Sequence, residues 1–168
     1  MKARVQSFAP LSEPGARVLV LGSMPGIASL QAHQYYAHPR NAFWSVIEAL
    51  FGIERSLCYD RRCRHLVSHG IALWDVLETC HRPGSLDANI DASSIVVNDF
   101  PGFFTEHPAI GKICFNGAAA EKMFLRHALP ALPEQAAGLP RIRLPSTSPA
   151  HAAMTLEQKI ETWRAGLF

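Results

Sequence analysis

The sequence lacks the features that mark exported, membrane-spanning or metal-binding proteins. No apolar run approaches the ~20 residues that a membrane-spanning helix requires. The first segment, MKARVQSFAP, has no apolar core of the kind found in signal peptides. The four cysteines form no C-x-x-C pair and show no spacing typical of zinc or iron–sulfur ligands. We therefore expect a cytoplasmic protein with reduced thiols and no bound metal.

Charged residues are also scarce. They make up 18% of the 168 residues, against 48% hydrophobic residues, and this composition excludes a disordered or fibrous chain. The formal net charge of +2 is too small to indicate nucleic-acid binding by itself. Lysine is rare, with 4 lysines against 12 arginines, and arginine is better suited to forked contacts with phosphates. The length predicts a single domain over residues 1–168, and we expect a monomer.

Common catalytic and nucleotide-binding motifs are missing as well. The chain has neither a G-x-G-x-x-G fingerprint nor a P-loop, which argues against the common nucleotide-binding folds. It has no G-x-S-x-G elbow of the serine hydrolases. The histidines His33, His38 and His151 are spaced too widely to form a compact metal-ligand set.

Short apolar runs alternate with amphipathic segments along the chain. The runs at 17–22, 70–74, 112–115 and 141–144 predict strands, and 94–98 fits either a strand or the entry of a Phe-rich helix capped by Asp99. Helices are predicted at 43–51, where Asn41 can serve as the cap, at 118–127, and from Thr155 onward. This alternation predicts an α/β fold with a mainly parallel sheet.

Four polar or glycine-rich segments follow the predicted strands directly. They are Gly22–Gly26, Asp75, Asn116–Gly117 and 145–151. Ligands of open parallel sheets bind beyond the carboxyl ends of the strands. We therefore expect these four segments to converge on one cleft.

Two of the segments near this cleft have a composition suited to nucleic acid. Residues 34–44 combine aromatic side chains, which can stack on bases, with His38, Arg40 and Asn41, which can donate to phosphates or base edges. Residues 145–151 offer three hydroxyls and no acid, which suits a phosphodiester. The alternatives are structural: a helix cap with core aromatics in the first segment, and a capping loop in the second.

Other segments allow more than one interpretation. Gly22–Gly26 could let backbone approach a ligand closely, or be a plain turn after a strand. Asp75 could be a buried carboxylate, a general base or a group that reads a ligand by hydrogen bonding. The basic cluster at 61–65 is most simply a solvated face, with non-specific DNA contact as the alternative.

Taken together, the motifs resemble those of the uracil-DNA glycosylase superfamily. They are Gly22-Ser-Met-Pro-Gly-Ile-Ala-Ser-Leu30, Tyr35-Tyr-Ala-His-Pro-Arg-Asn-Ala-Phe-Trp44, Phe115-Asn-Gly117 and Leu144-Pro-Ser-Thr-Ser-Pro-Ala-His151. Their order and spread over nearly the whole chain make the resemblance specific, and its nearest branch is the hypoxanthine-DNA (deoxyinosine) glycosylases. The resemblance implies a three-layer α/β/α sandwich around a four-stranded, mainly parallel sheet. It also implies hydrolysis of the N-glycosidic bond of a deaminated base in DNA, without any cofactor.

One residue departs from the family pattern. The first loop of the family normally carries a water-activating Asp or Asn two residues after its leading glycine, and here Met24 occupies that position. The resemblance to the hypoxanthine branch places the catalytic role on Asn41 instead. The histidine common in the second loop is replaced by Leu144, which leaves the departing base to be stabilised by backbone donors or other side chains.

The resemblance also implies roles for the remaining site residues. Tyr36 would stack on the extruded base and Asp75 would read its edge, for example by accepting from N1–H of hypoxanthine. The candidate base-contacting residues are Gly22, Ser23, Met24, Pro25, Gly26, Tyr36, Asp75 and Asn116. The candidate DNA-contacting residues are His38, Arg40, Ser146, Thr147, Ser148 and His151.

The sequence therefore predicts a monofunctional DNA glycosylase of base excision repair that prefers hypoxanthine and has DNA with a deaminated base as its partner. Two alternatives stay open. A uracil or mismatch glycosylase of the same fold would differ only in its preferred base. A catalytically silent nucleic-acid-binding module would explain Met24 differently.

Overall fold

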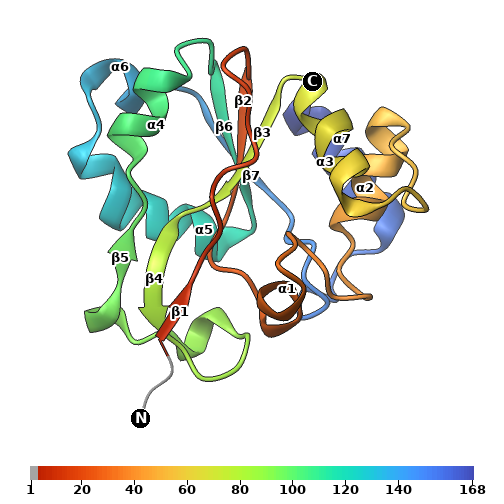
Figure 1. Cartoon of the computed structure of the whole chain (residues 1–168), viewed down its shortest axis with the longest axis horizontal. Coiled ribbons are helices and arrows are strands. Elements are labelled where there is room, and N and C mark those ends of the chain that lie inside the picture. Colours follow the sequence, from red (N-terminus) through yellow and green to blue (C-terminus); the bar gives the residue numbers. More distant parts are fainter. Residues whose placement is uncertain (1–3) are drawn as a thin grey trace.

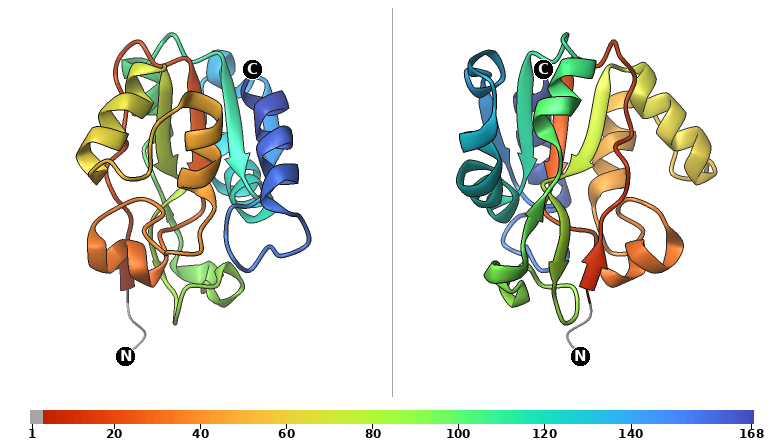
Figure 2. Two further views of the ribbon diagram at one scale, coloured as in Figure 1. Left: turned by 90° about the vertical axis from the view of Figure 1, so that its right-hand side faces the viewer. Right: turned by 60° about the vertical axis from the view of Figure 1, so that its left-hand side comes forward.

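The computed structural model describes residues 4–168, and its central element is a parallel sheet of four strands. The strands are β2 (Val18–Gly22), β3 (Ile71–Asp75), β6 (Lys112–Asn116) and β7 (Arg141–Leu144), in the spatial order β3-β2-β6-β7. All three pairings are parallel, so the carboxyl ends of the strands meet at one edge, at the bottom of Figures 1 and 2. The predicted α/β fold with a parallel four-stranded sheet is confirmed.

Helices cover both faces of this sheet because its strands are apolar on both sides (Figure 1). On one face lie α2 (Phe43–Phe51), α3 (Tyr59–Ser68) and α7 (Leu156–Leu167), which pack with Val20 and Leu73. On the other lie α4 (Phe100–Glu106) and α5 (Ala118–Met123), which pack with Leu19, Ile113 and Phe115. The result is a three-layer sandwich with two buried apolar clusters.

A second, antiparallel sheet was not predicted. It contains β1 (Arg4–Gln6), β4 (Leu77–His81) and β5 (Val96–Val97), in the order β1-β4-β5. Only Val76 separates β3 from β4, so the chain passes from the parallel sheet directly into the small one. This sheet lies below the central one at the lower left of Figure 1, beside the edge where the parallel strands end.

The remaining elements are short. They are the helices α1 (Ile27–Ala32) and α6 (Glu134–Ala137), a π-helical segment (Phe124–Ala128) after α5, and 3-10 turns at Asp87–Asn89, Ala92–Ser94 and Leu129–Ala131. The predicted cap Asp99 accepts from the Gly102 amide at 3.0 Å, and Thr155, where the last helix was predicted to start, forms a capping box with Gln158. The cap of α2 is Ala42 rather than Asn41.

Candidate active site

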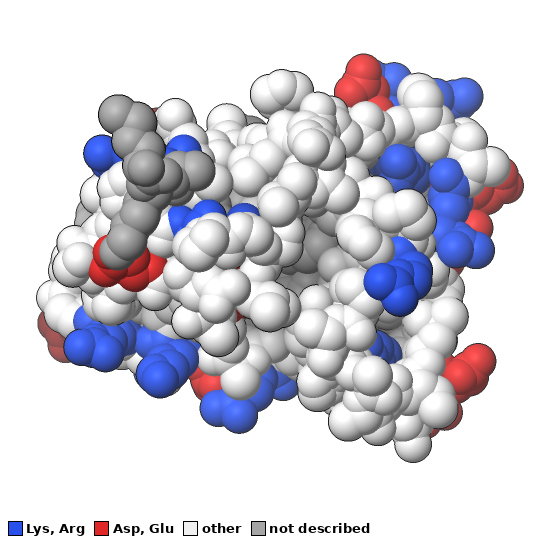
Figure 3. Space-filling model, turned by 90° about the horizontal axis from the view of Figure 1, so that it is seen from below, with Lys and Arg blue, Asp and Glu red and all other residues white. Residues whose placement is uncertain are grey.

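The loops at the carboxyl edge of the parallel sheet enclose a cavity of about 310 Å³. The four segments expected to converge do so: Gly22–Gly26, Asp75, Asn116 and residues of 145–151 all line it. His38 and Asn41 line it too, whereas Arg40 and His151 are not in its lining. Figure 3 views the molecule from this end and shows a hollowed face with basic side chains around it. The predicted site residues are therefore mostly neighbours in space.

Gly22, at the end of β2, sits where two site side chains approach the backbone. A Cβ atom there would lie 2.5 Å from Asp75 Oδ1 and 2.9 Å from the Tyr36 hydroxyl oxygen. Such distances are too short for any side chain other than hydrogen. Glycine at this position thus allows the carboxyl and the phenol to meet beside the strand end.

Alanine at position 22 provides a test of this close approach. We expect Gly22→Ala to displace Asp75 and Tyr36 and to lower the rate of the protein's reaction by about tenfold, as expected for over-packing a tight site. Single-turnover kinetics would measure the rate. Gly15→Ala is the matched control, because a Cβ at Gly15 meets nothing within 4 Å and Gly15, like Gly22, has no positive φ. An unchanged Gly22→Ala rate would contradict the tight packing.

Asp75 is a carboxyl group almost removed from water. It is 4% exposed, and its Oδ2 has no hydrogen-bond partner among residues 4–168. Burial raises its pKa to about 7, the charge of Asp87 adds to the rise, and Arg82 opposes it. At neutral pH the neutral acid is therefore well populated, and such an acid presents one donor and one acceptor.

Tyr36 lies beside Asp75 in a strained conformation. Its φ of 55° is in the left-handed region, and its ring stacks on Phe43 with centroids 4.2 Å apart and planes at 23°. Its hydroxyl oxygen is buried without a hydrogen-bond partner in the described part of the chain. Burial and the charge of Asp75 raise the phenol's pKa, so the group stays protonated. A donor and a carboxyl group, both unpaired, therefore lie next to each other at the cavity.

Asn41 joins the start of α2 to the cavity. Its Oδ1 accepts from the Phe43 amide at 2.9 Å, so the side chain assists the helix start although Ala42 is the cap. The Ala42 amide donates to Thr147 O at 2.9 Å, which ties this turn to the 145–151 loop. Because Oδ1 faces the helix, Nδ2 is the end of the amide left for a ligand.

Asn116 fixes the position of the 145–151 loop. Its Nδ2 donates to Thr147 Oγ1 and its Oδ1 accepts from the Thr147 amide, both at 2.9 Å. The Asn116 side chain thus fixes a loop rather than pointing free into the cavity. Its predicted contact with a base stays a prediction.

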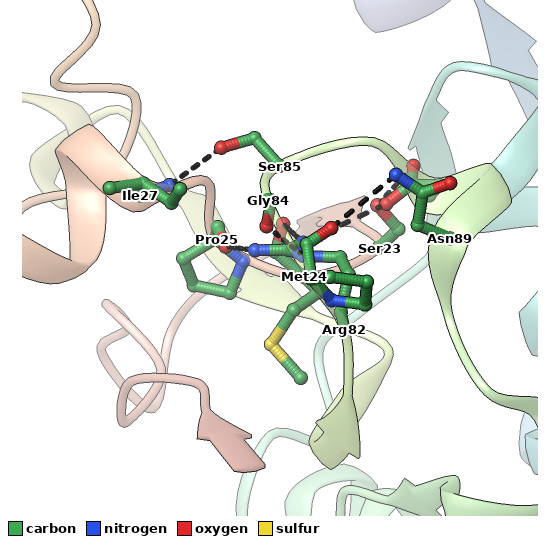
Figure 4. Close-up of polar contacts among 10 residues, drawn as sticks. Ser23, Met24, Pro25, Ile27, Arg82, Gly84, Ser85 and Asn89 are labelled. Carbon is green, nitrogen blue, oxygen red and sulfur yellow. Dashed lines mark hydrogen bonds and ion pairs between the residues drawn. The ribbon is translucent and has the colours of Figure 1, made fainter. Parts of the chain in front are cut away.

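Sequence reasoning missed Arg82 and Asp87. Arg82 is 1% exposed, and its guanidinium donates to the carbonyls of Met24, Pro25 and Gly84 (Figure 4). Asp87 lines the cavity, and its Oδ2 accepts from Ser23 Oγ at 2.7 Å. The segment 82–87 carries no motif, and its Pro-Gly composition indicates only a loop, so no signal in one sequence could have found these contacts.

Neither a metal site nor a membrane span is found in residues 4–168. No group of three or more His, Cys, Asp and Glu side chains there is arranged to hold a metal ion. No helix in the same range is both long and apolar enough to cross a bilayer.

Comparison with known proteins decides the family. The family model described as "Uracil DNA glycosylase superfamily" matches residues 9–165. The chain belongs to this superfamily. Two curated relatives are named "Hypoxanthine DNA glycosylase": one from Methanosarcina barkeri, 35% identical over 113 residues (67% of this chain and 70% of the relative), and one from Methanosarcina acetivorans, 34% identical over 116 residues (68% and 72%).

A solved structure supports the same superfamily at the level of fold. The solution NMR structure of a candidate uracil DNA glycosylase from Methanosarcina acetivorans matches with a TM-score of 0.77 and 27% identity, over 99% of this chain and 100% of that one. In the present protein, Met24 lines the cavity but is only 6% exposed and packs in an apolar cluster. The first loop therefore offers the cavity no ionisable side chain.

Proposed function

We propose that the protein is a monofunctional DNA glycosylase that binds a deaminated base, hypoxanthine by preference, in the cavity and hydrolyses its N-glycosidic bond. The observation that carries this proposal is the pair of buried, unpaired groups at Asp75 and Tyr36. Hypoxanthine presents N1–H as a donor next to O6 as an acceptor. A neutral carboxyl group can match this edge with its own acceptor and donor.

The cavity can receive only a base that has left the double helix. Extruding a base costs a few kcal/mol, and the cost is least for a mispaired base such as a deaminated one. We infer that the free face of the Tyr36 ring stacks on the extruded base, since the other face packs on Phe43. His38, Ser146 and Ser148, which line the same cavity, would hold the flanking phosphates, whereas Thr147 is 1% exposed and bonded to Asn116.

The bond to the base would break with its electron pair going to the base, which leaves a cationic sugar. A neutral Asp75 that donates to O6 would stabilise the negative charge that develops on the base. Asn41 Nδ2 would orient the water that captures the sugar. No lysine among residues 4–168 lines the cavity, so we infer that no Schiff base forms and that the product is an intact abasic site.

Matched duplexes carrying one deoxyinosine or one deoxyuridine test the proposal. We expect the wild-type protein to release hypoxanthine, which alkali treatment reveals as strand cleavage at the abasic site. Uracil shares the N–H and C=O edge through N3 and O4, so release of uracil alone would keep the reaction and overturn the base preference. If neither base is released while the duplex is still bound, the proposed glycosylase activity is overturned and a nucleic-acid-binding module is favoured.

A further inference from the structure

The carboxylate of Asp87 stands at the cavity outside every motif that the sequence offers. It begins a 3-10 turn, Asp87–Asn89, in the segment that follows β4. Its Oδ2 accepts from Ser23 Oγ at 2.7 Å, and its Oδ1 lies 4.0 Å from the buried guanidinium of Arg82. Asp87 therefore reaches the first loop from another part of the chain, at the residue next to Met24.

The two carboxyl groups of the cavity have different surroundings. The side chain of Asp87 is 31% exposed and has a hydroxyl donor and a cation beside it. Asp75 is buried and its Oδ2 has no partner in residues 4–168. Burial raises the pKa of both groups and Arg82 opposes the rise at both, but only Asp87 has the additional hydrogen bond from Ser23 that opposes it. Paired carboxyls in unequal surroundings can divide into an acid and a base, and the greater exposure and the hydroxyl donor favour the ionised form at Asp87.

Hydrolysis needs a proton acceptor, and Asn41 cannot act as one. When water adds to the cationic sugar it must lose a proton, and a neutral amide does not accept one at ordinary pH. Within the part of the chain that the structure describes, the carboxylates lining the cavity are those of Asp75 and Asp87. Asp75 is the more deeply buried of the two and is engaged with the base in the proposed mechanism.

We propose that Asp87 is a catalytic carboxylate of this site, which stabilises the cationic sugar and accepts the proton of the attacking water. This proposal rests on the proposed glycosylase function. The C1′–N9 bond breaks with its electrons going to the base, the water oxygen bonds to C1′, and one water proton passes to Asp87. That proton then returns to solvent, and the base anion takes one up, so that one water is consumed per base released.

A purely structural role for Asp87 predicts a different outcome from a catalytic one. If Asp87 only fastened the first loop, through Ser23 and its ion pair with Arg82, its loss would disturb the loop and weaken the binding of DNA together with the rate. Asp87→Asn keeps the shape and one acceptor oxygen but removes the charge. Asp60→Asn is the matched control, because Asp60 is an exposed carboxylate in the first turn of α3 and does not line the cavity.

The experiment measures single-turnover excision of hypoxanthine between pH 5 and pH 8, and binding of a duplex with a stable abasic-site analogue. We expect Asp87→Asn to excise about 100-fold more slowly. It should also lose the fall in rate toward acid pH, which reports protonation of Asp87 beside Ser23, Arg82 and Asp75. Binding of the analogue should stay within about threefold, and Asp60→Asn should match the wild type.

Asp87→Ala provides a second measurement that does not depend on the asparagine variant. If a carboxylate is required, added formate should restore several-fold of the lost rate, and chloride at equal ionic strength should not. An Asp87→Asn rate within threefold of the wild type, or an Asp87→Ala variant insensitive to formate, overturns the proposal for Asp87 alone. A wild-type protein that releases no base overturns the glycosylase function, and this proposal with it.

Discussion

Replacing Asn41 by alanine should lower the single-turnover rate of base excision by about 10³-fold, the upper range for removing one oriented hydrogen-bond donor from an active site. The expected effect is large because Oδ1 of Asn41 is held by the Phe43 amide at 2.9 Å, which fixes the direction of Nδ2. A fixed donor orients its water without further loss of entropy when the reaction occurs.

The same substitution removes a hydrogen bond at the start of α2, so stability must be measured beside the rate. We expect a loss of about 1 kcal/mol in the free energy of unfolding, from urea titration. Gln135→Ala, at an exposed amide in α6, is the control for the loss of an amide side chain away from the cavity. If the Asn41→Ala protein excises at the wild-type rate, the catalytic role of Asn41 is contradicted, and only its hydrogen bond with the Phe43 amide remains.

Replacing Asp75 by asparagine should stabilise the protein, and the gain should depend on pH. The folded-state pKa of about 7 lies above the ordinary value of 3.8, so an ionised Asp75 costs the folded state about 4 kcal/mol. That cost is absent below pH 4, grows as pH rises toward 7, and is constant at higher pH. An amide does not ionise, so Asp75→Asn should gain about 4 kcal/mol at pH 8 and less than half of that at pH 5.

Urea unfolding of both proteins at pH 5 and pH 8 measures this gain, because contributions from the other titrating groups cancel in the comparison. Excision gives a second result from the same variant. Asparagine presents one donor group and one acceptor oxygen, as the neutral carboxyl does, so activity should persist. The wild-type rate should fall above pH 7 as Asp75 ionises, and this fall should disappear in the variant. A variant less stable than the wild type at pH 8 would contradict the raised pKa of the buried Asp75.

Much of the framework follows from local sequence. The four strands of the parallel sheet are short apolar runs, and their carboxyl ends bring Gly22, Asp75 and Asn116 together by topology alone. The helix α3 was missed because its exposed face is basic and its buried residues, chiefly Cys63 and Leu66, are few. The strand β4 was missed because it follows β3 after a single residue and its sequence, LETCH, is too polar to stand out as an apolar run.

The contacts that complete the site depend on long-range pairing. Arg82 meets the carbonyls of Met24 and Pro25 across 58 and 57 residues of chain, and Ser23 meets Asp87 across 64. No periodicity or spacing encodes such pairs. Arg82, which is 1% exposed, directly follows β4 of the second sheet, which the sequence pattern did not predict.

The anchoring of the first loop by Arg82 has a consequence for how such a site can diverge. The guanidinium holds backbone carbonyls, which every residue type has, so these hydrogen bonds do not depend on which side chains stand at positions 24 and 25. A lineage could therefore exchange the residue at position 24 while keeping these anchoring hydrogen bonds of the loop that lines the cavity. The backbone of the loop is anchored, while its side chains can change. Position 24 is therefore the place to begin when designing new reactivity into the site.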